Sequence, residues 1–320
     1  MAKKPPALTD EQRAKLAEIE PQLRACVPCA DLTRAKRLAL EIQLMLRSTG
    51  HTTRLLQNKN WLFECALEAR EVDYAISGFE GNRQLAGKYT RIYLEATVLL
   101  AICYLRQGNI TKAKPLVHEA IILCPRNIQS PRRREQFHKR FLERLEQECV
   151  LTGLIEHNPR KIAVDDLHDE AVKLVQKNED ELAAILGNEL PSYSVQLLLD
   201  VQDFYHKQLT FPERKLLPAP TQKTNHRELG RKVNGAFKRV VWRVVCDPKN
   251  DVHQSWSKGL AHVYDGKVLV GAFAAAFNGW KIGNIVIASA ITALAIRIGA
   301  LTFCEAFAPD WLMIHVSEKD

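Results

Sequence analysis

Residue types that bind metals or catalyse reactions occur in this chain, but their spacing does not complete a site. Cys26 and Cys29 form a C-x-x-C pair, yet no second pair and no H-x-x-x-H follows to complete a zinc site. A redox site of the thioredoxin kind needs a preceding strand, and the surrounding pattern is helical. We therefore expect a structural turn between two helices at this cysteine pair.

The segment DDLHDE gathers acidic residues around His168. Carboxylates in the first turn of a helix explain this cluster as well as a metal site does. Nucleotide and nucleophile motifs are also missing, because Gly87-Lys88 lacks the G-x-x-x-x-G-K-[ST] pattern and no G-x-S-x-G or G-x-G-x-x-G is present. The sequence predicts no metal, no cofactor and no enzymatic activity.

The composition favours anionic partners. The 320 residues carry a formal net charge of +8, which suits an acidic protein, a lipid surface or nucleic acid. The basic segment SPRRREQFHKR offers phosphate contacts, but its aromatic residues Phe137 and Phe141 lie at core spacing, so nucleic acid is less favoured than a protein. No secretory signal is visible, and we expect a cytoplasmic chain whose eight cysteines are thiols.

Helical periodicity runs through the first two thirds of the chain. Thr9 is placed to cap a first helix, and Gly50 to end a second. Further amphipathic helices follow up to the proline-containing segment PERKLLPAPTQKTNH. This composition predicts a helical interaction domain over residues 1–220 and a basic, then hydrophobic region over residues 221–320.

The stretch from Leu94 to Asn127 has the pattern of a tight helical hairpin. Gly108 ends its first helix, small residues allow close helix packing, and Pro115 should kink or delay the second helix. This stretch resembles the tetratricopeptide repeat, a family that stacks pairs of antiparallel helices. The positions that carry the resemblance are Leu100, Ala101, Tyr104, Gly108, Ala113, Val117, Ala120 and Pro125.

A weaker copy lies upstream, where Ala75, Phe79 and Asn82 echo Ala113, Val117 and Ala120. The resemblance covers residues 50–130 and implies a stacked array with a concave surface that binds a peptide or protein.

Residues 271–303 form an alanine- and isoleucine-rich stretch whose only charges are Lys281 and Arg297. A membrane-spanning helix needs about 20 apolar residues, and a span of that length here includes Arg297. Trp280 and Lys281 suit a membrane interface. In one continuous helix, small residues four apart would form a packing ridge at Gly271, Ala275, Gly279 and Gly283.

Two interpretations of this tail remain open: membrane insertion, or a buried helical hairpin. In the first, the basic stretch at residues 227–243 would meet anionic lipid. The residues expected at lipid are Arg231, Lys238, Arg239, Arg243, Trp280, Lys281 and Arg297. Pore-forming colicins are similar in design, and the segment IRIGALTFCEAFAPDWLMI resembles the ends of membrane effectors in bacterial phage-defence systems.

We therefore expect an all-α chain, a helical array followed by a hydrophobic region read as transmembrane. The favoured function is a regulated effector of the toxin or abortive-infection type. Its array binds a partner, and its tail inserts in the inner membrane and permeabilises it. The alternative is a soluble interaction scaffold whose tail is a buried hairpin or the seam of a homo-oligomer.

Overall fold

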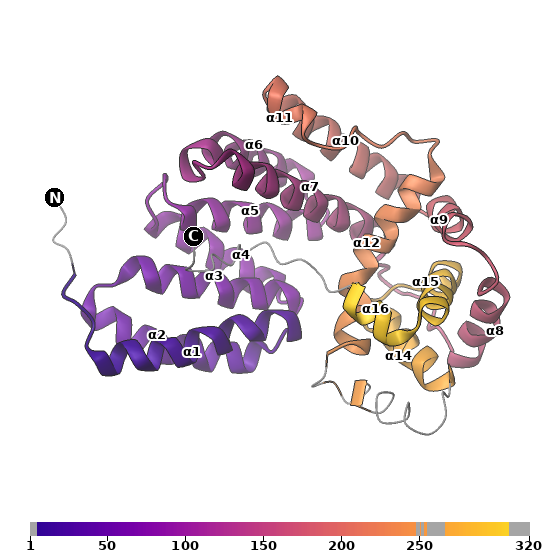
Figure 1. The fold of residues 1–320 in the computed structure, drawn as a ribbon, viewed down its shortest axis with the longest axis horizontal. Helices are drawn as coiled ribbons and strands as arrows, with labels where there is room; N and C mark the ends of the chain where they lie inside the picture. Colours follow the sequence, from indigo (N-terminus) through magenta and orange to yellow (C-terminus); the bar gives the residue numbers. More distant parts are fainter. Residues whose placement is uncertain (1–4, 248–249, 251–252, 255–265, 307–320) are drawn as a thin grey trace. The chain divides into compact units, whose positions relative to one another are not determined.

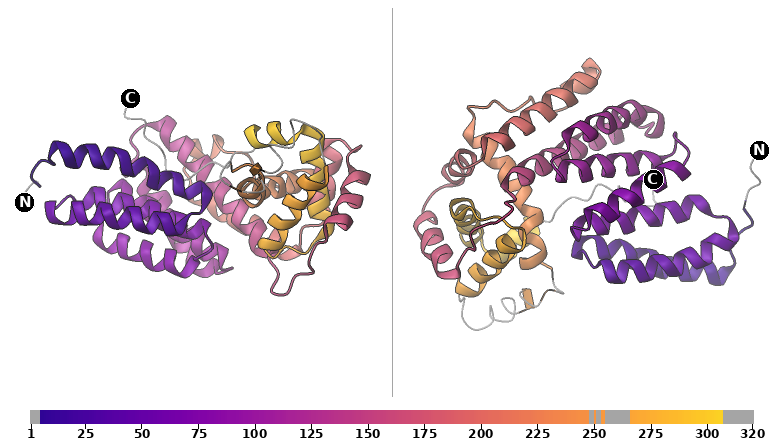
Figure 2. Two further views of the ribbon diagram at one scale, coloured as in Figure 1. Left: turned by 90° about the horizontal axis from the view of Figure 1, so that it is seen from below. Right: turned by 180° about the vertical axis from the view of Figure 1, so that it is seen from behind.

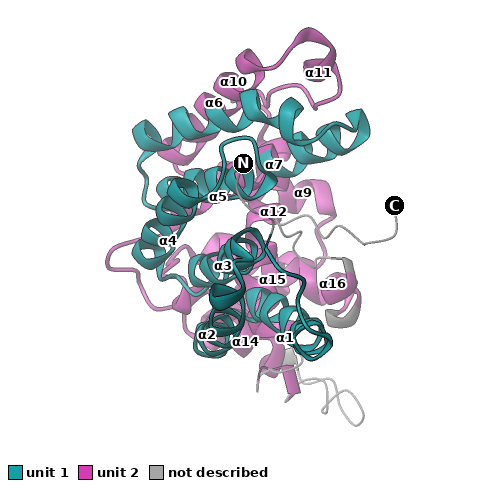
Figure 3. Cartoon of the chain, turned by 90° about the vertical axis from the view of Figure 1, so that its left-hand side faces the viewer, with its two compact units in different colours: residues 1–141, 311–320 teal, residues 142–310 magenta. Residues whose placement is uncertain are grey.

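The computed structural model describes residues 5–247, 250, 253–254 and 266–306. In this part, helices are the only regular secondary structure, and turns and loops connect them. These residues form two compact units, which Figure 3 shows in separate colours. Unit 1 contains the described residues up to Phe141, and unit 2 contains those from Leu142 onward. The boundary lies within a helix, whereas composition placed it near residue 220.

Unit 1 is a series of antiparallel helical hairpins (Figures 1 and 2). Its first helix is capped as predicted: the Thr9 Oγ1 accepts the Gln12 N–H at 3.1 Å, and the Gln12 Oε1 accepts the Thr9 N–H at 3.0 Å. The helices are α1 (Asp10–Cys29), α2 (Leu32–Thr49), α3 (Thr52–Glu68), α4 (Val72–Leu85), α5 (Arg91–Arg106), α6 (Ile110–Asn127) and α7 (Pro131–Leu154), which continues into unit 2.

The same turn joins the two helices of each hairpin. Ala30, Arg70 and Gly108 have positive φ angles of 52°, 68° and 71°, the left-handed conformation that commonly ends a helix. In each turn this residue donates its N–H to the carbonyl three residues earlier, and the next residue donates to the carbonyl five residues before it. Helices α1 to α6 are therefore three hairpins of one repeating design.

The second helix of each hairpin begins with the same packing residue. Ala35, Ala75 and Ala113 each follow their turn by five residues, and none is more than 1% exposed. A side chain this small lets the second helix approach the first closely. The copy predicted around Ala75 is thus a hairpin of the same design. The two helices predicted before Gly50, α1 and α2, form another hairpin of this design, a likeness that the sequence did not reveal. α6 begins at Ile110 and includes Pro115.

The hairpins pack into two layers. α3 contacts α1 and α5 as well as its own partner α4, whereas α2 and α4 pack chiefly on the first helices of the hairpins. Hence α1, α3 and α5 form one layer, called here the inner layer, and α2, α4 and α6 form the outer layer. Phe63 of α3 packs edge-to-face on Phe79 of α4, with ring centroids 5.7 Å apart, and so marks the side of α3 that faces the outer layer.

Unit 2 is built around α12 (His226–Val245), which packs against α9 (Glu179–Asn188) and α14 (Gly266–Gly279). The α9–α12 crossing brings backbone against backbone. A Cβ added to Gly230 of α12 would lie 1.7 Å from the Ala183 carbonyl oxygen, and one added to Gly187 of α9 would lie 1.9 Å from the His226 carbonyl oxygen. The other helices described after α7 are α8 (Val164–Leu174), α10 (Ser192–Gln208), α11 (Phe211–Lys215), α15 (Ile285–Ile298) and α16 (Ala300–Ala306).

Helices α14 and α15 contribute much of the core of unit 2. α15 packs on α8 and α9, and α14 packs on α8 and α12. Phe273, Phe277 and Ile291 are at most 1% exposed. The Phe277 ring lies 5.1 Å from the ring of Phe237 in α12. The apolar side chains that favoured lipid contact are therefore buried against other helices of the unit.

Among the described residues, no helix combines the length and the apolar character that crossing a bilayer requires. The chain turns at Lys281, where φ is 58°, and this turn divides the apolar stretch into two helices of 14 residues each. A span needs about 20. The predicted transmembrane region is thus not supported. Residues 307–314, the end of the segment compared with phage-defence effectors, lie outside the described residues.

The expectation that all cysteines are thiols is wrong at one pair. Cys246, which follows α12, and Cys304 of α16 form a disulfide with Cα atoms 5.3 Å apart. They are 58 residues apart in sequence, so spacing alone did not indicate the pairing. The other six cysteines are thiols, as expected, and only Cys29 among them is not buried.

Candidate functional site

The inner layer of unit 1 carries a polar network on the side away from the outer layer. Arg54, Gln57 and Trp61 lie three and four residues apart in α3, turned away from Phe63. All three are partly exposed. The network, called here the inner-layer network, consists of Glu20, Arg24, Arg54, Gln57, Trp61, Arg91 and Glu95.

Between α1 and α3, the network is held by an ion pair and a cation–π contact. The Arg54 guanidinium donates through Nε and Nη2 to the two carboxylate oxygens of Glu20, at 2.7 and 2.8 Å. The Asn58 amide also donates to Glu20, at 2.9 Å. The Arg24 guanidinium lies 4.9 Å from the centroid of a Trp61 ring. Such bidentate and stacked contacts fix the orientation of both side chains.

Between α3 and α5, the network centres on one carboxylate. The Glu95 Oε2 accepts a hydrogen bond from the Gln57 amide at 3.0 Å, and its Oε1 accepts one from the Arg91 Nε at 2.8 Å. The Asn60 amide beneath them donates to the Ile92 carbonyl at 3.1 Å and accepts a bond from Asn82 at 2.8 Å. Polar bonds therefore connect all three inner helices.

The two carboxylates of the network differ in acidity. Burial raises the pKa of Glu95 above its ordinary value, and its bonds to Arg91 and Gln57 do not offset this. Burial also acts to raise the pKa of Glu20, but hydrogen bonds from Arg54 and Asn58 outweigh it, so that pKa is lowered. Glu20 is therefore held as an anion, whereas the charge of Glu95 is costly to maintain.

Deeper in the inner layer, further acidic residues are buried. Glu64 and Glu68 are 4% and 1% exposed, and both are engaged in interactions. They follow Gln57 and Trp61 at helical spacing on α3. This surface presents arginine, tryptophan, amide and carboxylate groups in fixed positions, and such groups recognise a protein segment through hydrogen bonds and stacking.

The residues at the predicted repeat positions have structural roles in the hairpin of α5 and α6. Leu100, Ala101 and Ala120 are at most 1% exposed. The Tyr104 hydroxyl donates to Glu80 at 2.8 Å, and burial together with this carboxylate raises the pKa of Tyr104 to about 12. Pro125 lies in the last turn of α6, which ends at Asn127. These residues build the hairpin, and none belongs to the inner-layer network.

The candidate chemical residues do not gather into a site. Cys26 and Cys29 lie in the last turn of α1, where the Cys26 thiol donates to the Gln22 carbonyl at 3.3 Å. His168 lies in α8 near the acidic first turn. The described residues contain no group of three or more side chains suited to holding a metal ion.

Several residues expected at a lipid surface contact other residues of unit 2. The Arg231 guanidinium donates to Asp180 at 2.9 Å, and the buried Arg239 donates to Gln147 at 2.8 Å. Trp280 is 5% exposed. Lys238 and Arg243, also on α12, are partly buried and engaged in interactions.

Lys281 and Arg297, the last two residues expected at lipid, lie at a turn and in the last turn of α15. The Lys281 carbonyl accepts the Glu156 N–H at 2.9 Å, and the Arg297 guanidinium donates to the Lys177 carbonyl at 2.5 Å. Contact of these seven residues with lipid stays a prediction.

The small-residue ridge is interrupted. α14 ends at Gly279, so Gly283 lies in the following turn, where an added Cβ would be 2.9 Å from the Arg160 backbone nitrogen. Gly271 and Gly279 have open space where a Cβ would be, and Ala275 is exposed. The four residues therefore do not pack a second described helix as one ridge.

The sequence did not reveal the inner-layer network. The sequence signal for it was the helical spacing of Arg54, Gln57 and Trp61. That these residues share a face with residues of the other inner helices becomes visible only once the hairpins are aligned at their turns, such as Ala30 and Arg70. Comparisons with family models, curated proteins and solved structures found no match to the chain. The site therefore has to be interpreted from its own geometry.

Proposed function

We propose that the chain is an interaction scaffold whose tetratricopeptide-like array binds an extended segment of a partner protein through the inner-layer network. The observation that carries this proposal is the continuous polar network across α1, α3 and α5. Apolar side chains and small residues such as Ala35 and Ala113 already pack the hairpins, and the network adds polar groups on the face away from the outer layer. Polar groups fixed on one face are suited to recognition.

The residue types support a protein ligand. Tryptophan and arginine are enriched at the energetic centres of protein interfaces, and Trp61 with Arg24 supplies both in one stacked pair. Amides such as that of Gln57 can exchange hydrogen bonds with an extended backbone. The inner layer presents these groups from three parallel repeats, which matches the repeating geometry of a peptide.

The test is peptide binding to the full chain. Peptides are selected from a random display library, and their affinities for the wild type and the Trp61→Ala variant are compared by fluorescence polarisation. We expect Trp61→Ala to weaken binding at least about tenfold, roughly 1.4 kcal/mol, because the stacked pair is lost.

A matched control lies on the outer layer. Leu44 of α2 is 68% exposed, and Leu44→Ala should leave the affinity unchanged. Peptides that bind Trp61→Ala as tightly as the wild type, or that weaken with Leu44→Ala instead, would contradict the proposal.

Membrane permeabilisation, which the sequence favoured, is not proposed as the function. It would require α14 and α15 to leave the core of unit 2, where Phe273 and Phe277 are fully buried. Binding through the array needs no such rearrangement.

A further inference from the structure

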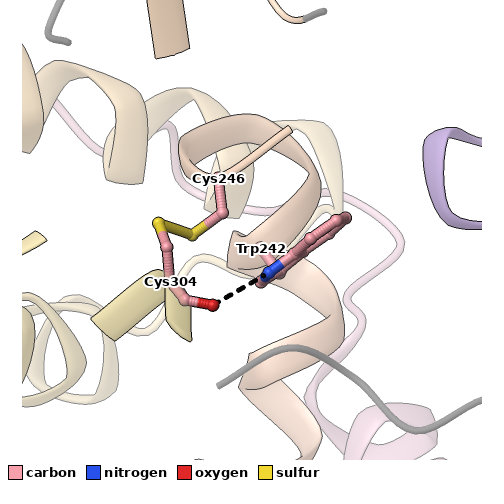
Figure 4. The surroundings of a disulfide bond; sticks show 3 residues. All are labelled: Trp242, Cys246 and Cys304. Atoms are coloured by element: carbon pink, nitrogen blue, oxygen red, sulfur yellow. Dashed lines mark hydrogen bonds between the residues drawn. A yellow bond between two sulfur atoms is a disulfide. The ribbon is translucent and has the colours of Figure 1, made fainter. Parts of the chain in front are cut away.

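The disulfide of unit 2 joins the two ends of its apolar region. Cys246 directly follows α12, and Cys304 lies in α16, so the linked loop contains both α14 and α15. Figure 4 shows the bond beside Trp242, whose indole Nε1 donates to the Cys304 carbonyl at 3.4 Å. The cross-link therefore fixes the end of the apolar region to α12.

Within the described part of the chain, α16 also packs on α12 and α15. It spans only Ala300–Ala306, and its buried anchor is Phe303, whose ring lies 5.8 Å from that of Phe273. Gly299 separates it from α15 with a φ of 83°, and an added Cβ there would meet nothing within 4 Å. A glycine in open space with positive φ is a suitable hinge. Without the disulfide, this short helix would be held against α12 by noncovalent contacts alone.

α16 also borders a cavity of about 290 Å³. Leu294 and Ile298 of α15 and Leu186 of α9 form part of its apolar lining, and Thr302 contributes from α16. Asp180 and Arg231, which pair at 2.9 Å, also line it. A displacement of α16 would therefore remove Thr302 from the wall of this cavity.

We propose that Cys246–Cys304 is a reversible thiol–disulfide switch that controls whether α16 covers this cavity and the adjoining apolar core of unit 2. The inference does not depend on the proposed binding function of unit 1. Cys304 is partly exposed, whereas Cys246 is 5% exposed, so an attacking thiolate reaches Cys304 more readily.

The reductant is a dithiol. One of its thiolates attacks the Cys304 Sγ, the S–S bond breaks, and Cys246 leaves as a thiolate that takes up a proton. The second thiol of the reductant then attacks the mixed disulfide and releases the Cys304 thiol. Two electrons and two protons reach the protein, and the reductant becomes a disulfide. Oxidation by a disulfide-containing donor runs the same exchange in reverse.

The switch is tested on the full chain by hydrogen exchange with mass spectrometry, before and after treatment with dithiothreitol. Peptide mapping without reductant should first recover the Cys246–Cys304 cross-link. Reduction should raise amide exchange in residues 299–306 at least tenfold, and leave α10 unchanged. Removal of dithiothreitol and reoxidation should restore the slow exchange.

Two variants sharpen the result. Cys246→Ser should exchange like the reduced wild type whether or not dithiothreitol is present. Cys149→Ser removes a buried free thiol of the same unit and should keep the full response to reductant. Should Cys246→Ser fail to fold, the reversible change in the wild type decides the question.

Fluorescence offers an independent readout, because a disulfide quenches a neighbouring indole. Reduction should increase the emission of the wild type more than that of Trp242→Phe. Failure to recover the cross-link, or unchanged exchange in residues 299–306 after complete reduction, would overturn the proposal.

Discussion

The two units differ in their main helix contacts. In unit 1, long polar side chains such as Arg54, Gln57 and Asn82 bridge neighbouring helices. In unit 2, glycines at the α9–α12 crossing bring two backbones into contact, and the interior is filled by apolar residues of α14 and α15. Unit 1 therefore has polar groups available for recognition, whereas the apolar surface of unit 2 is used within the unit.

The largest effect is expected at the glycine crossing. Gly230→Ala places a Cβ 1.7 Å from the Ala183 carbonyl oxygen, and neither backbone can move without separating α9 from α12. We expect a loss of about 3 kcal/mol in the free energy of unfolding of unit 2. Denaturant unfolding followed by circular dichroism measures the loss, and hydrogen exchange in α9 localises it.

Gly235→Ala is the matched control, since it makes the same change in the same helix with nothing within 4 Å of the new Cβ. It should stabilise by about 0.5 to 1 kcal/mol, because glycine is a poor helix former. Equal effects of the two substitutions would show that α9 and α12 do not cross as described.

The polar bridges of unit 1 should come next. Asn82→Ala removes the donor to the Leu56 carbonyl at 3.1 Å and to the Asn60 side chain at 2.8 Å, and leaves both acceptors buried. The expected loss is about 2 kcal/mol. Thermal unfolding measures it, with Asn127→Ala as the comparison, because Asn127 bonds only to the Leu123 carbonyl of its own helix in the described contacts. An Asn82→Ala loss no larger than that of Asn127→Ala would mean that the amide network contributes little.

The inner-layer carboxylates should respond oppositely to pH. The pKa of Glu95 is raised, so its contribution to stability is present below about 4.5 and is lost as the pH rises through its folded value. The pKa of Glu20 is lowered, so its contribution is present above about 4.5 and is lost as the pH falls. In Glu95→Gln, the free energy of unfolding should therefore fall less than in the wild type as the pH rises above about 4.5. In Glu20→Gln, it should fall less than in the wild type as the pH drops below about 4.5. The same change of slope in both variants would contradict the opposite shifts.

The smallest effect is expected at the repeated turn. Ala30 holds a left-handed φ of 52° that glycine adopts more easily, so Ala30→Gly should stabilise unit 1 by about 0.5 kcal/mol. Gly108→Ala makes the reverse change at the equivalent place in the third hairpin and should destabilise by about 1 kcal/mol. Melting temperatures that shift in the same direction for both would argue against a common turn.

The sequence revealed those parts of the fold that depend on local signals. Gly108 and Ala113 marked one hairpin because glycine and alanine have distinct backbone and packing preferences. A turn was expected at the Cys26–Cys29 pair, but its likeness to the turns at Arg70 and Gly108 was not seen, because Ala30 and Arg70 adopt the left-handed conformation without being glycine. A residue of that kind gives no signal when the sequence is considered alone.

Other features depend on contacts between distant segments. Hydropathy identified residues 271–303 as apolar, but whether they meet lipid or protein depends on helices such as α8 and α12, far away in sequence. The polar network was likewise hidden, because Arg54 and Glu20 are 34 residues apart and either residue alone resembles an ordinary surface charge.

The binding role proposed for the inner layer of unit 1 is tested most directly by cross-linking. A photoreactive benzophenone residue is introduced in place of Trp61 or of Leu44. Each full-length protein is irradiated with a peptide selected for binding to the wild type. For the Trp61 position, the peptide concentration is raised to offset the weaker binding. The account predicts cross-links from position 61 on the inner layer and none from position 44. Cross-links from position 44 alone, or equal cross-linking from both positions, would contradict it.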